Sequence, residues 1–213
     1  MNWDTFLFLL TGLEWTVLLS AVGFVGGGIF GLAVALMRTS GIGPLERSAA
    51  GYIALFQGTP LLMQLFVVYY GLALIGFKLD AWIAVAIGFT LHASAFLGEI
   101  WRGSIEAVPR GQTEAAKALS LHYVTRMKDV ILPQAIRISL PATVGFLVQL
   151  IKGTSLAAIV GFTELTRSGN IVSNQTFKPL LVFGVVGLLY FLLCWPLSLY
   201  GTYLERRMAT ASR

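Results

Sequence analysis

Apolar runs of membrane-spanning length constrain this chain more than any other feature of its sequence. Five such runs are expected, at residues 15–37, 52–77, 81–101, 137–162 and 179–203. A helix needs about 20 apolar residues to cross the hydrocarbon core of a bilayer. Hydrophobic residues make up 56% of the chain and charged residues only 12%. We therefore expect a single all-α integral membrane domain over residues 1–213, with about five transmembrane helices.

The basic residues set the expected orientation, because they gather in loops on the cytoplasmic side of membrane proteins. Eleven of the fifteen lie on one side of the expected spans and three on the other. This predicts an N-terminus outside, a C-terminus in the cytoplasm and a cytoplasmic loop at about 102–136. The eleven are Arg38, Arg47, Arg102, Arg110, Lys117, Arg126, Lys128, Arg137, Arg206, Arg207 and Arg213; the three are Lys78, Arg167 and Lys178.

The same placement argues against nucleic acid as a partner, although the net charge is +5. The cations flank apolar runs, which fits a membrane surface and its lipids. The acidic N-terminus, with Asp4 and Glu14, lacks the basic leader of a cleavable signal peptide. The single cysteine, Cys194, supports neither a disulfide nor a metal site.

The loop at 102–136 contains a segment with helical composition. Residues 114–121 (EAAKALSL) are nearly all good helix formers. Thr113 is a plausible N-cap, with Glu114 near the positive end of the helix dipole. Helical spacing puts one group of residues on a single, mostly small face: Ala115, Ala118, Leu119 and His122. A helix of this kind outside the bilayer favours docking to another protein; the alternative is an interfacial helix without a partner.

The second span carries a helix-breaking segment near its start. Gly58, Thr59 and Pro60 predict a kink or a broken helix. Gln64 lies just beyond them among apolar residues, and an amide inside a membrane needs a partner. It forms an interhelical hydrogen bond or lines a solute path.

The third span contains an isolated histidine, His92, with no second histidine or cysteine near it. A metal site is therefore not expected, and a hydrogen-bonded packing role is favoured over a proton relay. At the end of the same span, Glu99 and Arg102 lie three residues apart and are expected to pair.

The fourth span contains a lysine, Lys152, just past its middle. A lysine at the centre of a span costs about 2.5–3.5 kcal/mol on insertion scales, so it must face protein or water. Gly153, Thr154 and Ser155 follow and weaken the helix. Lys152 either pairs with Glu164 or faces a solute path.

Three motifs resemble a known family. GQTEAAKALSL followed by VILPQA resembles the EAA loop of permease subunits of ATP-binding-cassette importers. GTPLLMQLF and EIWRGSIEAVPRGQ are similar to RGTPLLVQLF and EIIRGGIQSIPRGQ of the polar amino-acid uptake permeases. The chain departs from the family pattern at Gln57 (arginine in the family), Ser120 (glycine) and Gly153 (an acidic or amide residue).

The resemblance implies a permease subunit of the bacterial inner membrane that imports polar amino acids by alternating access. It implies a second permease, an outer solute-binding protein and a pair of cytoplasmic ATPase subunits, which would hold the ATP and magnesium. The coupling residues that it implies are Gly111, Glu114, Ala115, Ala116, Ala118, Leu119 and Ser120. Candidate residues of the solute path are Gln64, Lys152, Thr154, Ser155 and Glu164.

An enzymatic role is not expected for this chain. It contains no GxxxxGK[ST] phosphate-binding loop, so we expect ATP hydrolysis on a separate subunit. It also shows no nucleophile elbow or paired carboxylates for hydrolysis in the membrane. The alternative function is that of a secondary transporter or channel subunit that does not use ATP.

Overall fold

The computed structural model describes residues 2–211, and Arg213, assigned above to the cytoplasmic side, lies outside this range. Every element in the described part of the chain is helical, which confirms the all-α prediction. The α-helices are α1 Trp3–Arg38, α2 Gly43–Gln57, α3 Leu61–Phe66, α4 Leu72–Leu74, α5 Ala81–Glu106, α6 Arg110–Ala118, α7 Tyr123–Arg126, α8 Leu132–Gly153, α9 Leu165–Thr176 and α10 Pro179–Ala211. Two π-helical segments, η1 Val67–Gly71 and η2 Met127–Ile131, and one 3₁₀ segment, η3 Thr154–Val160, continue these helices.

Four helical segments are long and apolar enough to cross a membrane: Trp3–Arg38, Ala81–Glu106, Tyr123–Val160 and Pro179–Met208. A fifth span exists if α2 and the segment Leu61–Leu74 are taken together, and these two are bent by 102° relative to each other. The break falls at Gly58–Pro60, where the sequence predicted it. The second span is therefore interrupted rather than straight.

The helices extend beyond the apolar runs from which they were predicted. α1 begins at Trp3 instead of residue 15, and α5 continues to Glu106 instead of residue 101. The fourth span begins at Tyr123 instead of residue 137. Charged residues can prolong a helix outside the membrane, as the Arg102 ion pairs do at the end of α5. The predicted loop at 102–136 thus shortens to 107–122, with α6 inside it.

A row of glycines brings α1 against α5. A Cβ added to Gly27 would overlap the Cβ of Ala93, and one added to Gly31 would lie 3.0 Å from the carbonyl oxygen of Ser94. Close backbone approach of this kind is what small residues allow in membrane helix pairs. The crossing of α1 over α5 is therefore fixed by glycine.

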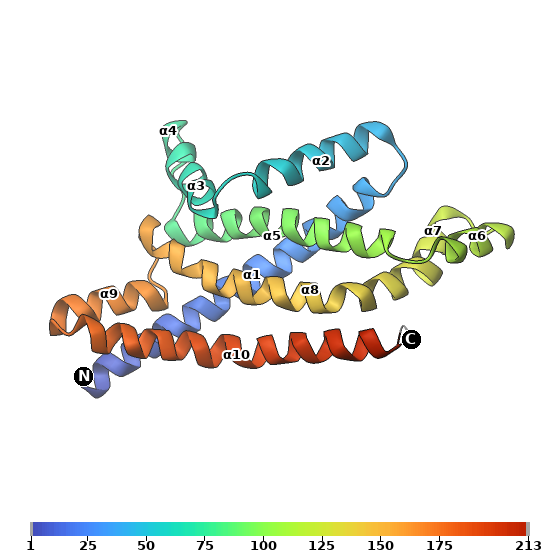
Figure 1. Ribbon diagram of the computed structural model, residues 1–213. Coiled ribbons are helices and arrows are strands. Elements are labelled where there is room, and N and C mark those ends of the chain that lie inside the picture. The colour runs from blue at the N-terminus through green and yellow to red at the C-terminus, as the bar shows by residue number, and fades with distance from the viewer. Residues whose placement is uncertain (1, 212–213) are drawn as a thin grey trace.

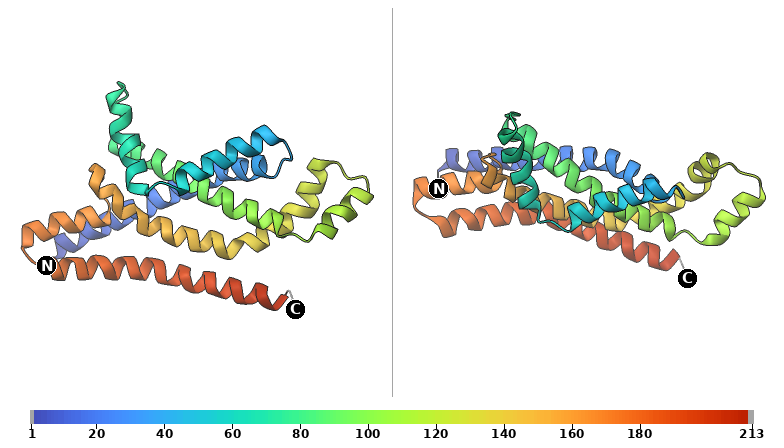
Figure 2. Two further views of the ribbon diagram at one scale, coloured as in Figure 1. Left: turned by 45° about the horizontal axis from the view of Figure 1, so that its top comes forward. Right: turned by 90° about the horizontal axis from the view of Figure 1, so that it is seen from above.

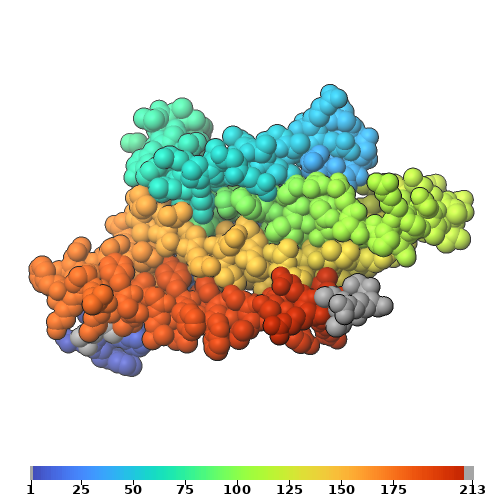
Figure 3. Space-filling model, in the orientation of Figure 1, coloured from blue at the N-terminus to red at the C-terminus, as the bar shows by residue number. Residues whose placement is uncertain are grey.

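The two termini lie at opposite ends of an elongated bundle (Figure 1). The N-terminus and α9 share one end, which we call the α9 end; α6 and α7 project at the other, which we call the α6 end, and the C-terminus lies toward it (Figure 2). The α3–α4 segment stands away from the bundle, on the same side as α2 (Figure 3). The sequence did not predict α9 as a helix.

Candidate functional site

α6 presents a small, exposed surface at the projecting end of the molecule. It begins at Arg110, directly after Pro109, so Thr113 lies inside the helix and is not its N-cap, as had been predicted. Pro109 occupies the N-cap position, and its side chain makes no capping hydrogen bond. One face of α6 is exposed and combines four of the predicted coupling residues: Gly111, Glu114, Ala115 and Ala118.

The other predicted coupling residues are placed differently around this face. Ala116 is only 2% exposed and packs toward the bundle, so it holds α6 in place instead of contributing to the exposed surface. Leu119 is 74% exposed but lies past the last helical residue, as does His122. The predicted face of Ala115, Ala118, Leu119 and His122 is therefore exposed but only half helical.

Ser120 turns the chain out of α6 with a left-handed backbone (φ 56°). Its amide donates to the carbonyl oxygen of Lys117 at 2.8 Å, and the Leu121 amide donates to that of Ala116 at 3.0 Å. This is the exit that a glycine normally makes after a helix. Ser120 thus preserves the turn at the position where the resembled family has glycine, at a cost in backbone strain.

The last turns of α5, which lead to α6, are fixed by a charged triad. The Arg102 guanidinium forms an ion pair with Glu99 at 2.5 Å and another with Glu106 at 2.5 Å. The predicted pairing of Glu99 with Arg102 is confirmed. The triad stiffens the connection between the membrane helix and α6.

Gln64 bridges the broken span to α5. Its amide nitrogen donates to the carbonyl oxygens of Phe56 (2.7 Å) and Thr59 (3.0 Å), which the break leaves without helical partners. The amide oxygen of Gln64 lies 2.9 Å from Nδ1 of His92. Because an amide oxygen can only accept, Nδ1 of His92 carries the hydrogen. The interhelical hydrogen bond predicted for Gln64 is present. His92 also packs on Phe96, as expected of a packing histidine (ring centroids 4.5 Å apart).

Lys152 lies exposed near the end of α8, beside a groove between α8 and α10. Polar residues of both helices line this groove: Gln149, Ser198, Thr202 and Glu205. The Lys152 ammonium has no carboxylate within ion-pair distance in the part of the chain that the structure describes. The predicted alternative of a Lys152–Glu164 pair is therefore wrong for this conformation.

The two hydroxyls after Lys152 serve the local backbone. Thr154 is fully buried and donates to the carbonyl oxygen of Ile151 at 2.7 Å, while Ser155 donates to that of Lys152 at 2.8 Å. Both bonds stabilise the change from α-helix to the 3₁₀ segment η3. Of these predicted path residues, Lys152 is thus the one whose polar group is free to meet a solute.

Glu164 is fully buried at the start of α9. Its carboxylate accepts from the amides of Thr166 and Arg167, each at 2.9 Å, and so caps the helix. The hydroxyl of Tyr190 on α10 donates to the same carboxylate at 2.9 Å, and that of Thr16 on α1 donates at 3.4 Å. We call Glu164 and these four partners the Glu164 cluster.

This cluster gives Glu164 a structural task, whereas the sequence had suggested the solute path. Burial raises the pKa of its carboxyl, and the two capping amides oppose that rise. Sequence reasoning missed Thr16 and Tyr190, which lie 148 and 26 residues from Glu164. A tyrosine hydroxyl in an apolar span was the available signal, because such a group needs a partner.

Metal chemistry has no candidate site within residues 2–211, where no three His, Cys, Asp or Glu side chains converge.

Comparison with known proteins places this geometry in a family. The family described as "Binding-protein-dependent transport system inner membrane component" matches residues 27–210. A probable amino-acid ABC transporter permease protein, YckA of Bacillus subtilis, is 35% identical over 97% of this chain and 91% of its own length. The arginine transport system permease protein ArtQ of the same organism is 35% identical over 94% of this chain and 92% of its own.

Solved structures agree with these relatives. A crystal structure of an amino acid ABC transporter with histidines superimposes with a TM-score of 0.87 at 34% identity, covering 94% of both chains. An inward-facing structure of the MetNI methionine ABC transporter has a TM-score of 0.84 over 97% of this chain and 99% of its own. At 20% identity, this match supports only the fold of the present chain. This evidence favours an importer component over the secondary transporter or channel considered above.

With an all-helical bundle, an exposed α6 and matches over most of its length, this chain belongs to the family of inner-membrane components of binding-protein-dependent transport systems and is a multi-pass membrane transport subunit, not an enzyme.

Proposed function

We propose that this chain is the permease subunit of an ATP-driven importer of polar amino acids. The similarity to permeases named for arginine, glutamine and octopine transport supports the cargo class. The observation that carries the mechanism is α6, a short helix with an exposed small-residue face at the projecting end of the bundle. Small residues leave room for close approach by another protein.

In this proposal, a partner ATPase binds the face of Gly111, Glu114, Ala115 and Ala118, together with Leu119 and Ser120 next to it. ATP and magnesium bind to that partner. α6 lies between α5 and α7 in the chain, so its displacement moves both α5 and the continuous helix that begins at Tyr123. The ATPase then shifts the permease between its conformations through its different affinity for each.

Uptake of a labelled polar amino acid into vesicles that contain the assembled importer tests this function. Ala118→Trp overfills the docking face, and we expect uptake to fall at least about fivefold, since overpacking costs about 1–3 kcal/mol. Lys117→Trp adds the same bulk outside this face, at an exposed position, and should leave uptake near normal. Uptake that persists without ATP, or in Ala118→Trp, would contradict the proposal.

The solute path is proposed to run along the exposed side of α8. Ala142, Gly145, Gln149 and Lys152 follow each other there at helical spacing, and all four are exposed. Lysine and glutamine inside a span avoid lipid, so this side faces water or the second permease subunit. The unpaired ammonium of Lys152 can then bind the carboxylate of an amino acid. Gln64, Thr154, Ser155 and Glu164 shape the surrounding helices instead.

Lys152→Met tests this assignment, because it keeps the length of the side chain and removes its charge. Assembly and basal ATPase activity should be retained while uptake falls at least about tenfold, the loss expected for a hydrogen bond to a charged group. The matched control is Lys178→Met, at the exposed outer end of α10. A Lys152→Met variant that does not assemble would indicate a structural role, and full uptake would exclude the lysine from the path.

The proposed topology puts the α6 end in the cytoplasm and the α9 end outside, where a solute-binding protein would deliver the cargo. After replacement of Cys194, a cysteine at Ser120 should resist an impermeant thiol reagent added to intact cells, and one at exposed Gln175 should react. Ser173, on the same helix, is only 8% exposed and is unsuitable as a probe. The reverse pattern of labelling would invert the orientation.

A further inference from the structure

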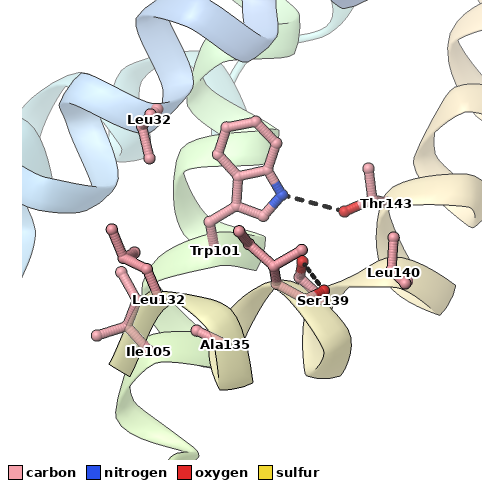
Figure 4. A pocket seen from close by; sticks show the side chains of 9 residues that line it. Leu32, Trp101, Ile105, Leu132, Ala135, Ser139, Leu140 and Thr143 are labelled. Atoms are coloured by element: carbon pink, nitrogen blue, oxygen red, sulfur yellow. Dashed lines mark hydrogen bonds between the residues drawn. The ribbon is translucent and has the colours of Figure 1, made fainter. Parts of the chain in front are cut away.

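The α6 end contains an apolar cavity of about 280 Å³ between α1, α5 and α8. Figure 4 shows the Trp101 indole at its centre, with Leu32 from α1 on one side and Leu132, Ala135 and Leu140 from α8 around it. An apolar cavity of about 150 Å³ is enough to hold benzene. The cavity beside Trp101 therefore has room for a larger hydrocarbon group.

The few polar groups in its walls are already bonded. Trp101 Nε1 donates to Thr143 Oγ1 at 3.1 Å, and Ser139 Oγ donates to the carbonyl oxygen of Ile136 at 2.9 Å (Figure 4). The hydroxyls of Ser139 and Thr143 keep some hydrogen-bonding capacity, but the rest of the lining offers a water molecule only apolar contacts. The cavity thus favours hydrocarbon over water.

A second, polar pocket of about 370 Å³ lies next to this cavity, toward α6. The two share Ile105 and are lined by successive parts of the same segments: Leu32 then Arg38 on α1, and Leu132 then Ile131 on α8 and η2. The end of α5 also lines both. Going along α1, the lining changes from apolar to charged where the membrane-spanning helix ends.

Arginines outnumber carboxylates in the lining of the polar pocket, and Arg38 also interacts electrostatically with Glu99 of α5, which lies outside that lining. Arg38, Arg110 and Arg126 line it together with Glu46 and Glu106. Glu106 already pairs with Arg102, and Glu46 accepts from the amide of Gly41 at 2.9 Å. Both carboxylates are therefore partly used elsewhere.

One of the three arginines has a buried donor with no acceptor. The Nε of Arg38 is inaccessible to solvent and has no hydrogen-bond partner within the described part of the chain. Buried polar groups are nearly always bonded, and a guanidinium binds phosphate particularly well. Because this nitrogen is closed to solvent, an anion in the pocket is expected to meet the two terminal nitrogens of the same guanidinium.

We propose that the two pockets together hold one anionic phospholipid, with its phosphate among Arg38, Arg110 and Arg126 and part of an acyl chain beside Trp101. Basic pockets between membrane helices bind anionic headgroups. The adjoining apolar cavity selects a lipid over a free anion. The lipid would lie between α1 and the start of α6. Its binding would be independent of which solute the importer carries.

Native mass spectrometry of the assembled importer tests this proposal, with phosphatidylglycerol and phosphatidylcholine of equal chain length as probes. We expect the anionic lipid to be retained preferentially. Arg38→Gln should weaken its binding about fivefold, the equivalent of about 1 kcal/mol per basic residue near anionic lipid. Arg47→Gln is the matched control, an exposed arginine on the same side that lines neither pocket, and should bind normally.

The apolar half is tested separately. Leu140→Trp should fill the cavity and weaken binding of the same lipid, whereas Leu199→Trp on the exposed side of α10 should not. Equal retention of both lipids, or equal binding by the Arg38 and Arg47 variants, would overturn the proposal. So would phosphatidylglycerol binding that survives Leu140→Trp while inorganic phosphate competes for it, because the pocket would then hold a free anion. If Arg38→Gln does not assemble, Arg126→Gln takes its place with the same expected loss.

Discussion

The two ends of the bundle treat their charged groups differently. At the α9 end, Glu164 is fully buried and its carboxylate is bonded by groups from α1, α9 and α10. At the α6 end, Glu114 is exposed, and Arg38, Arg110 and Arg126 form no ion pair within the described chain.

This difference shows which end the chain completes by itself. The Glu164 cluster closes α9 onto its neighbours with contacts from the same chain, so a change there should reduce stability. The α6 end leaves charged groups exposed or without an ion pair in the described chain, so we infer that other molecules complete it. A change there should affect association with partners and leave the fold intact.

Glu164→Ala should have the largest effect on stability. It leaves two capping amides and the Tyr190 hydroxyl without their acceptor, and we expect a loss of about 2–4 kcal/mol in the free energy of unfolding. Thermal unfolding of the purified chain in detergent measures this. Glu114→Ala, on the exposed face of α6, should change stability by less than about 0.5 kcal/mol. Equal effects of the two substitutions would remove the contrast between the ends.

Tyr190→Phe should have an intermediate effect, because it removes one hydroxyl of the cluster and keeps the ring. We expect a loss of about 1 kcal/mol. Tyr203→Phe, where the side chain is 56% exposed, is the control and should be neutral. In the Glu164→Ala background, the Tyr190 substitution should cost less than it does alone, because its acceptor is already gone. Simple additivity would show that the two groups do not interact.

Ser120→Gly should have the smallest effect and the opposite sign. Relief of the left-handed strain at φ 56° should contribute about 1 kcal/mol, and the freer unfolded chain should offset about 0.5 of it. The variant should therefore unfold at a slightly higher temperature. Ser120→Ala keeps a Cβ in the same conformation and should give no such gain. A glycine variant less stable than the natural chain would mean that the serine hydroxyl has a task of its own.

The sequence was sufficient to predict what depends on local pattern. The apolar runs predicted the membrane helices, Gly58–Pro60 predicted the break, and the spacing of Glu99 and Arg102 predicted their pair. Helix ends were predicted less well, since charged residues continue α5 and the helix from Tyr123 past the apolar runs.

What the sequence could not predict depends on contacts between distant segments. Glu164 was predicted to line the solute path, because its partners Thr16 and Tyr190 could not be recognised from the sequence. They come from other helices, and no periodicity of the sequence links them to Glu164. α9 was missed because its small polar residues gave no apolar period, and its start depends on the Glu164 cap.

We infer that a partner ATPase completes α6, whereas the Glu164 cluster is complete within this chain. Measuring both ATPase affinity and unfolding temperature for Ala118→Trp and Glu164→Ala tests it most directly. We predict that Ala118→Trp unfolds at the natural temperature but binds the ATPase at least about fivefold more weakly. Glu164→Ala, measured below its lowered unfolding temperature, should bind normally. Normal ATPase binding by Ala118→Trp would show that the ATPase does not dock on this face of α6.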